Sequence, residues 1–192
     1  MERYNRINGK AHEMLSLDYF SRNADKYCGC KINEITQTSP SLLLSENDFS
    51  RIDANADSDS GTLGIEFKWR EYPLKVKYYY DGCYVDAAKL DNLAEGYGDN
   101  GKFIAFWPVA EAVFVWTTSG ENMAKWGSTL SEEDLPKNNT TDEVEKELVY
   151  KLPFGDAQRF WFDSDGWKGL FAEYVQAVKA ANGYAPYNAY HQ

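Results

Sequence analysis

Apolar residues near the two ends of the chain recur at the spacing of amphipathic helices. The first such segment runs from about Ile7 to Lys26, with apolar positions mostly three or four residues apart, and its predicted end is near Cys28-Gly29. Residues 169–181, GLFAEYVQAVKAA, show the same spacing close to the C-terminus. A third helical pattern covers Val85 to Glu95. The pattern therefore predicts at least three helices, each with one apolar face.

Segments typical of β-strands separate these helices. Residues 31–38 alternate as a half-buried strand does, and the turn pair Ser39-Pro40 follows them. Two apolar runs, Phe103–Trp107 and Ala112–Trp116, read as neighbouring strands, and Phe160-Trp161 as a short one. Residues 117–147 are polar and acidic, which predicts an irregular excursion. The order of elements indicates an α/β (α+β) fold with a central mixed β-sheet flanked by helices.

The composition agrees with one folded domain over residues 1–192. Hydrophobic residues make up 43% of the chain and aromatic residues 16%, enough apolar material for a real core. A chain of 192 residues lies within the usual size of one domain. We expect residues 7–118 to form the core, and residues 119–192 to hold the polar excursion and the C-terminal helix.

The stretch FSRIDANADSDSGTLGIEFKW, residues 49–69, is the most informative part of the chain. Its centre, Ser58–Gly61, consists of turn residues between two extended segments, which predicts a β-hairpin. With these four residues in the turn, Asp53 falls opposite Glu66. Directly opposed residues share a face of the sheet, and Lys68, two positions beyond Glu66, shares it too. The other face is apolar and carries Ile52, Ile65, Phe67 and Trp69.

Two carboxylates side by side repel each other unless a cation compensates them. Carboxylate oxygens are the ligands that Mg²⁺ prefers, and Mn²⁺ is a close substitute. A lysine beside such an ion would position or deprotonate a water molecule. Asp53, Glu66 and Lys68 therefore provide the groups that phosphodiester hydrolysis needs.

An acidic residue on one strand, followed by the triplet Glu66-Phe67-Lys68 on the next, resembles the PD-(D/E)XK nuclease superfamily, whose fold is that of restriction endonucleases. The resemblance implies that Asp53, Glu66 and the backbone carbonyl of Phe67 hold the metal, and that Lys68 prepares the attacking water. It also implies an accessory role for Glu13 on the first helix. Arg70 and Lys89 are the candidate phosphate contacts, and DNA is the expected substrate. The sequence departs from the family name at Ile52, which stands where the proline would be.

Other interpretations use the same residues. Asn55, Asp57, Asp59 and Glu66 have the spacing of an EF-hand loop, but the flanks read as strands and Ser60 stands where that loop needs glycine. A solvated sheet face with a cross-strand ion pair would also produce this alternation. A nuclease-like or unrelated α/β domain that serves as a binding or assembly module is the alternative function.

The charge narrows the mode of nucleic-acid binding. The net charge of −10 and the pI of about 4.7 argue against nonspecific coating of DNA. Acidic residues concentrate in residues 41–65 and 119–147, whereas Lys68, Arg70, Lys75 and Lys77 form a local basic strip. We expect a metal-dependent enzyme that contacts DNA locally, with homo-oligomerisation left open.

The sequence also bears on the compartment. Cys28, Cys30 and Cys83 form neither a disulfide framework nor a zinc motif. No apolar run approaches the about 20 residues of a membrane helix, and the N-terminal residues do not read as a signal peptide. The sequence therefore predicts a soluble cytoplasmic protein with no membrane partner.

Overall fold

The computed structural model describes residues 2–44, 52–71, 74, 82–136 and 144–184. The helices are α1 (Glu2–Ser21), α2 (Ala24–Cys28), α3 (Ala87–Tyr97), α4 (Gly120–Gly127) and α5 (Trp167–Ala181). The strands are β1 (Ile32–Gln37), β2 (Ala54–Ser58), β3 (Gly61–Trp69), β4 (Gly82–Asp86), β5 (Gly101–Trp107), β6 (Ala112–Thr117), β7 (Ser131–Pro136), β8 (Val144–Pro153) and β9 (Gln158–Trp161).

Six strands form the central sheet, in the order β1-β2-β3-β5-β6-β9. β3 and β5 run parallel, because the chain crosses over through β4 and α3 between them, and all other neighbours are antiparallel. The sheet is therefore mixed, and helices flank it, as the sequence predicts. β3, one of the two central strands, carries the Glu66-Phe67-Lys68 triplet, and β5 lies parallel beside it.

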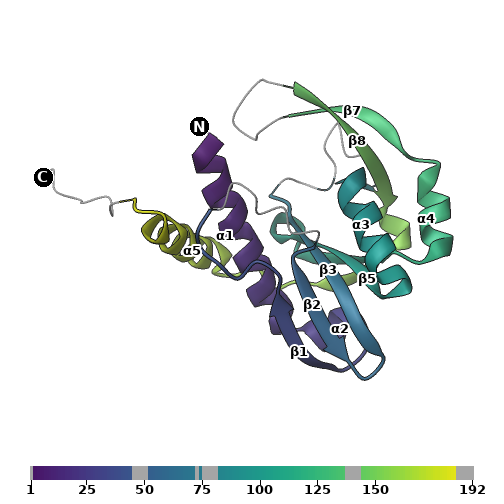
Figure 1. The fold of residues 1–192 in the computed structure, drawn as a ribbon, viewed down its shortest axis with the longest axis horizontal. Helices are drawn as coiled ribbons and strands as arrows, with labels where there is room; N and C mark the ends of the chain where they lie inside the picture. Colours follow the sequence, from purple (N-terminus) through teal and green to yellow (C-terminus); the bar gives the residue numbers. More distant parts are fainter. Residues whose placement is uncertain (1, 45–51, 72–73, 75–81, 137–143, 185–192) are drawn as a thin grey trace, which may run out of the picture.

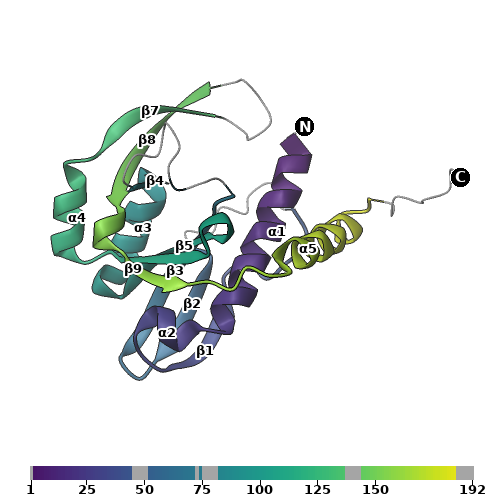
Figure 2. The same ribbon diagram turned by 180° about the vertical axis from the view of Figure 1, so that it is seen from behind.

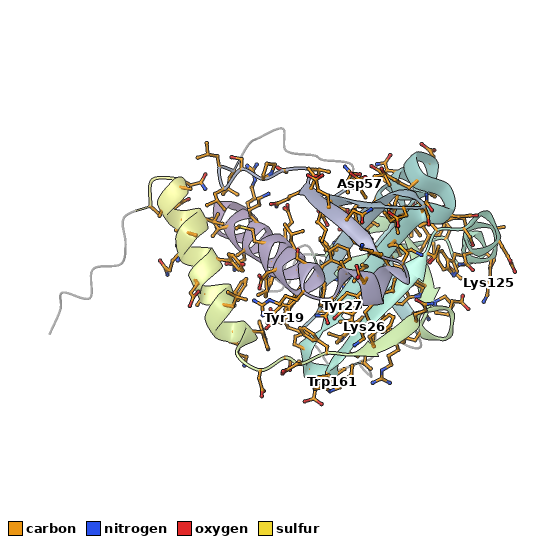
Figure 3. The ribbon with its side chains drawn as sticks, turned by 90° about the horizontal axis from the view of Figure 1, so that it is seen from below. Tyr19, Lys26, Tyr27, Asp57, Lys125 and Trp161 are labelled. Carbon is orange, nitrogen blue, oxygen red and sulfur yellow. The ribbon has the colours of Figure 1, made fainter. Side chains whose placement is uncertain are left out.

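Helices cover the two faces of the sheet unequally. In Figures 1 and 2, α1 and α5 lie on one side, and α3 and α4 lie on the other together with the strands β7 and β8. Alternate residues of β5 divide between two cores, because successive side chains of a strand point to opposite faces. Ile104 and Phe106 pack with Leu15 and Phe20 of α1, whereas the alternate residues Phe103, Ala105 and Trp107 pack with Leu90 and Leu93 of α3. Figure 3 shows Tyr19 and Tyr27 between these first helices and the sheet, and Trp161 at its edge.

The predicted irregular excursion at residues 117–147 is wrong. The structure forms α4 and β7 there, and β8 follows in a second sheet of order β4-β8-β7. β7 reads SEEDLP, which carries too few apolar residues to show strand alternation. β7 pairs with β8, the next strand along the chain, and β8 pairs with β4, which lies far away in the sequence. Such strands form through tertiary pairing that local composition does not reveal.

Two predicted helices also have different limits. The N-terminal helical segment is interrupted, since α1 ends at Ser21 and α2 begins at Ala24. The third helix begins at Ala87, because Val85 belongs to β4. Asp86 sets this start as the N-cap, its carboxylate accepting hydrogen bonds from the main-chain N–H groups of Ala88 and Lys89. Lys75 and Lys77 of the predicted basic strip lie outside the described residues. Among the helices that the structure describes, none is both long and apolar enough to cross a membrane.

Replacing Gly64 with alanine is expected to destabilise the protein by about 1–3 kcal/mol through overpacking. A Cβ atom on Gly64 would lie 2.3 Å from the ring of Tyr97, whose hydroxyl donates a 2.6 Å hydrogen bond to Asn55 of β2. Gly127→Ala is the matched control, since nothing lies within 4 Å of a Cβ there. Urea denaturation measures both variants. Equal midpoints for Gly64→Ala and the parent would show that the ring yields without cost.

Candidate active site

The hairpin of β2 and β3 forms in the predicted register. Ala54 pairs with Ile65, and Ser58 pairs with Gly61, at the two ends of the ladder. Asp53 immediately precedes β2 and extends this contact, because its N–H donates to the carbonyl of Ile65 over 3.0 Å. The N–H of Phe67, beyond the last paired residue, donates a 2.7 Å hydrogen bond to Oδ2 of Asp53. This bond fixes the Asp53 carboxylate beside the Glu66-Phe67-Lys68 triplet.

The chain leaves the predicted face just before Asp53. Ile52 packs with Val85 and Leu90 on the α3 side of the sheet, whereas Ile65 and Phe67 pack on the α1 side. The prediction that Ile52 shares the apolar face of β3 is therefore wrong. The reason is that the β2 ladder starts only at Ala54, so strand alternation does not govern Ile52.

Glu66 is buried in the centre of β3, with 1% of its surface exposed. Its Oε1 atom accepts a hydrogen bond from the ammonium of Lys89 on α3. Its Oε2 atom is enclosed and has no hydrogen-bond partner among the described residues. Burial, and next the negative charge of Asp53, raise the pKa of Glu66 to about 7, against the opposing effects of Lys89 and Lys68. The surroundings of Glu66 therefore disfavour its charged form at neutral pH.

Lys68 lies one alternation beyond Glu66 and is half-buried. The pKa of Lys68 is lowered to about 8, first by desolvation and then by the positive charges of Arg70 and Lys89. The negative charges of Glu66 and Asp53 oppose this shift only in part. No hydrogen bond or ion pair joins its ammonium to another described residue. A lysine with this pKa exchanges its proton near neutral pH, as a general base must.

A cavity of about 310 Å³ brings these groups together with one face of α1. It is lined by Gly9, His12, Glu13, Ser16, Asp53, Phe67, Lys68, Trp69 and Lys89. The four α1 residues follow helical spacing, so they form one stripe beside the buried Ile7, Ala11 and Leu15. Asp53, Lys68 and Lys89 therefore face a shared space, with the buried Glu66 held behind the Lys89 ammonium.

Glu13 occupies the α1 wall of this cavity and is already well bonded. Its carboxylate accepts hydrogen bonds from Lys10, at 3.0 and 3.1 Å, and from Gln37 of β1, at 2.7 Å. Burial raises the pKa of Glu13 despite these contacts, and the charge of Asp53 contributes to the rise. Glu13 is therefore close enough to interact with the Asp53 carboxylate, although its oxygens have protein partners.

Two cavity residues have no role in the sequence interpretation. The His12 ring stacks on Phe171 of α5, with centroids 4.2 Å apart, and its Nε2 atom lies 2.9 Å from Oε1 of Glu71. Trp69 extends the stack, 6.1 Å from His12. Adjacent helical residues point in different directions, so the sequence alone does not place His12 beside Glu13. The cavity is wide enough for both to line it, and the i, i+3, i+4, i+7 polar stripe of α1 was the available signal.

Arg70 lies beyond the cavity lining. Its Nη2 atom donates a 2.9 Å hydrogen bond to the carbonyl of Tyr84 in β4, and its main-chain N–H donates to the carbonyl of Phe106 in β5. The phosphate role of Arg70 remains a prediction. The EF-hand interpretation is wrong, because strands flank the turn, and the Asp57 and Asp59 carboxylates accept hydrogen bonds from Thr62 and Asn33.

The donor set suits a hard divalent cation. Asp53 and Glu66 supply carboxylates, and because the enclosed Oε2 atom of Glu66 has no hydrogen-bond partner, a cation at this carboxylate would compensate its charge. Within the described ranges, no group of three His, Cys, Asp or Glu side chains is placed to hold a metal. Mg²⁺ fits this pair, since it is commonly bound through one or two carboxylates and keeps several waters.

Comparisons with known proteins assign no function to this chain, so the function is argued from the residues of the site. No family model and no curated protein matches the chain. Among solved structures, the chain is similar to D212, described as a nuclease from a fusselovirus, with a TM-score of 0.44 and 12% identity over 89% of this chain and 95% of that one. A likeness this weak carries no conclusion about activity.

Proposed function

We propose that this protein is a metal-dependent nuclease that hydrolyses DNA phosphodiester bonds. The observation that carries the proposal is the convergence of Asp53 and Lys68 on one cavity, with the buried Glu66 carboxylate directly behind its Lys89 wall, at the same end of β2 and β3. Two carboxylates in mutual repulsion and a lysine with a lowered pKa are costly to keep together in a solvated sheet face. Perturbed groups of this kind concentrate at functional sites.

Each residue has a separate role in this proposal. Asp53, Glu66 and the carbonyl of Phe67 would hold a Mg²⁺ or Mn²⁺ ion, which supplies Lewis-acid polarisation of the phosphate and a lowered pKa of bound water. Neutral Lys68 Nζ takes a proton from the attacking water as its oxygen bonds to phosphorus, and the leaving oxygen departs with the electron pair of its bond to phosphorus and takes a proton from solvent. Lys89, with Arg70 farther out, offers positive charge to the phosphate backbone.

We further propose membership of the PD-(D/E)XK superfamily. Support comes from the order of elements around the triplet. α1 precedes the hairpin, α3 follows it, and β5 lies parallel to the strand that bears Glu66 and Lys68. A helix before the hairpin, and a helix and then a strand after the triplet, are the surroundings that the resemblance implies for residues 7–118.

Purified protein is expected to cleave DNA in Mg²⁺ or Mn²⁺ and to be inactive in EDTA. Asp53→Asn should abolish cleavage and the thermal stabilisation by Mn²⁺, because it removes the ligand whose Oδ2 is fixed by Phe67. Asp57→Asn is the matched control, since Asp57 is an exposed residue of the same hairpin, away from the cavity. Gel assays on linear duplex, supercoiled and single-stranded DNA, with thermal-shift scans, measure both effects.

The alternative, a binding or assembly module, gives the opposite pattern. Such a protein would cleave none of these DNA forms, and its melting temperature would not respond to Mn²⁺ in either the parent or the two variants. That result would rule out the nuclease proposal.

A further inference from the structure

Neither carboxylate oxygen of Glu66 is open to an incoming metal ion. Oε1 is held by the Lys89 ammonium, and Oε2 is enclosed within the protein. The whole residue is 1% exposed. Any cation that reaches Glu66 from the cavity therefore meets Lys89, which lines that cavity. The accessible way to a carboxylate ligand passes through a resident positive charge.

The position of Lys89 allows the ammonium to leave while its backbone stays fixed. The residue lies in the first turn of α3, where its N–H donates to the Asp86 cap, so the start of its side chain is anchored. The side chain is 42% exposed, whereas its partner Glu66 is almost fully buried. A lysine stem has four rotatable carbons, so rotation of the stem carries the charge into solvent without moving the helix.

We propose that Lys89 is a tethered counter-ion that occupies the Glu66 carboxylate in the metal-free protein and gives way when the metal binds. This inference rests on the proposed metal site. A buried carboxylate is costly without a compensating charge, and Lys89 provides one until a divalent cation replaces it. Lys89 thus keeps the carboxylate in place before the metal binds. It also lowers the metal affinity of the site, because the metal must displace the ammonium. The displaced ammonium then lies at the cavity, where a DNA phosphate would pass.

The decisive experiment is a Mn²⁺ titration without DNA, followed by electron paramagnetic resonance of the free ion. Lys89→Met keeps most of the stem and removes the charge, so it should bind Mn²⁺ about tenfold more tightly than the parent. The titration is run at about pH 8, where protons compete least for a carboxyl of raised pKa. Lys31→Met is the control, because Lys31 is an exposed residue just before β1 and does not line the cavity. The Mn²⁺ affinity of this variant should equal that of the parent.

A second variant tests the same exchange in the other direction. Lys89→Arg retains the charge and can hold the carboxylate through two hydrogen bonds, so it should bind Mn²⁺ more weakly than the parent. It also covers the case in which Lys89→Met does not fold. A purely structural role of Lys89 would instead make Lys89→Met bind more weakly than the parent.

The outcomes separate this inference from the proposed function. Equal or weaker Mn²⁺ binding by Lys89→Met, with measurable binding by the parent, overturns the counter-ion role and leaves the metal site standing. If Lys89→Met does not fold, an affinity of Lys89→Arg equal to or above that of the parent overturns it in the same way. Absence of Mn²⁺ binding by the parent overturns both. Tighter binding by Lys89→Met, or weaker binding by a folded Lys89→Arg, supports the exchange.

Discussion

Lys68→Met is expected to lower DNA cleavage about 10²–10⁴-fold, the usual contribution of a positioned acid or base. Methionine fills a similar volume and cannot accept a proton from water. The fold should persist, because the half-buried ammonium is disfavoured by desolvation, as its lowered pKa of about 8 shows. Single-turnover cleavage under saturating Mg²⁺ measures the loss, and thermal denaturation confirms that the variant is folded.

The pH profile of the parent gives a second measure of the same role. Below its pKa of about 8, Lys68 holds its proton and cannot act as a base. The cleavage rate should therefore rise with pH and level off near or below that value, since a bound divalent cation lowers the pKa of the neighbouring lysine further. Lys31→Met, which changes an exposed lysine, should retain both the rate and the profile. An unchanged rate for Lys68→Met would reject the assigned mechanism even in an active enzyme.

Glu66→Gln is expected to stabilise the metal-free protein while abolishing cleavage and Mn²⁺ binding. The pKa of Glu66 rises from 4.5 to about 7 on folding, because burial and Asp53 disfavour its charge. A shift of that size corresponds to about 3 kcal/mol, and each kcal/mol to about 2–4 °C in melting temperature for a chain of this length. Glutamine is a neutral replacement of nearly the same shape.

The sign of this effect depends on pH. A raised carboxyl pKa means that the folded state binds more protons than the unfolded state between 4.5 and about 7, so stability falls as pH rises through that window. The stabilisation by Glu66→Gln should thus be full above pH 7 and vanish near pH 4.5. Thermal denaturation in EDTA across this range measures it, with Glu95→Gln, an exposed residue of α3, as the control. A loss of stability above pH 7 would mean that the Lys89 ion pair outweighs burial of the charge.

Much of the central sheet could be predicted because its signals are local. The turn residues Ser58–Gly61 and the alternation on both sides fix the hairpin register, and the apolar runs of β5 and β6 identify buried strands. The second sheet could not be predicted in the same way. β7 is an acidic edge strand, and it exists because β8 supplies its hydrogen-bond partners.

The candidate site divides in the same way. The hairpin register predicts from the sequence alone that Asp53 lies near Glu66 and Lys68, because the position of the turn decides which residues of the two strands lie opposite each other. It does not place Lys89, because the approach of α3 to β3 depends on helix packing. It likewise does not show that His12 and Glu13 of α1 line one cavity with these residues.

The sequence by itself determined the mixed sheet with flanking helices and the register of the β2–β3 hairpin, because periodicity and turn chemistry act over a few residues. Only the tertiary structure decided the electrostatic state of the site. Burial beneath α3 raises the pKa of Glu66, the enclosed surroundings lower that of Lys68, and the Lys89 ammonium covers the carboxylate. Desolvation and charge pairing depend on every element packed around a group, and no local pattern in the sequence encodes them.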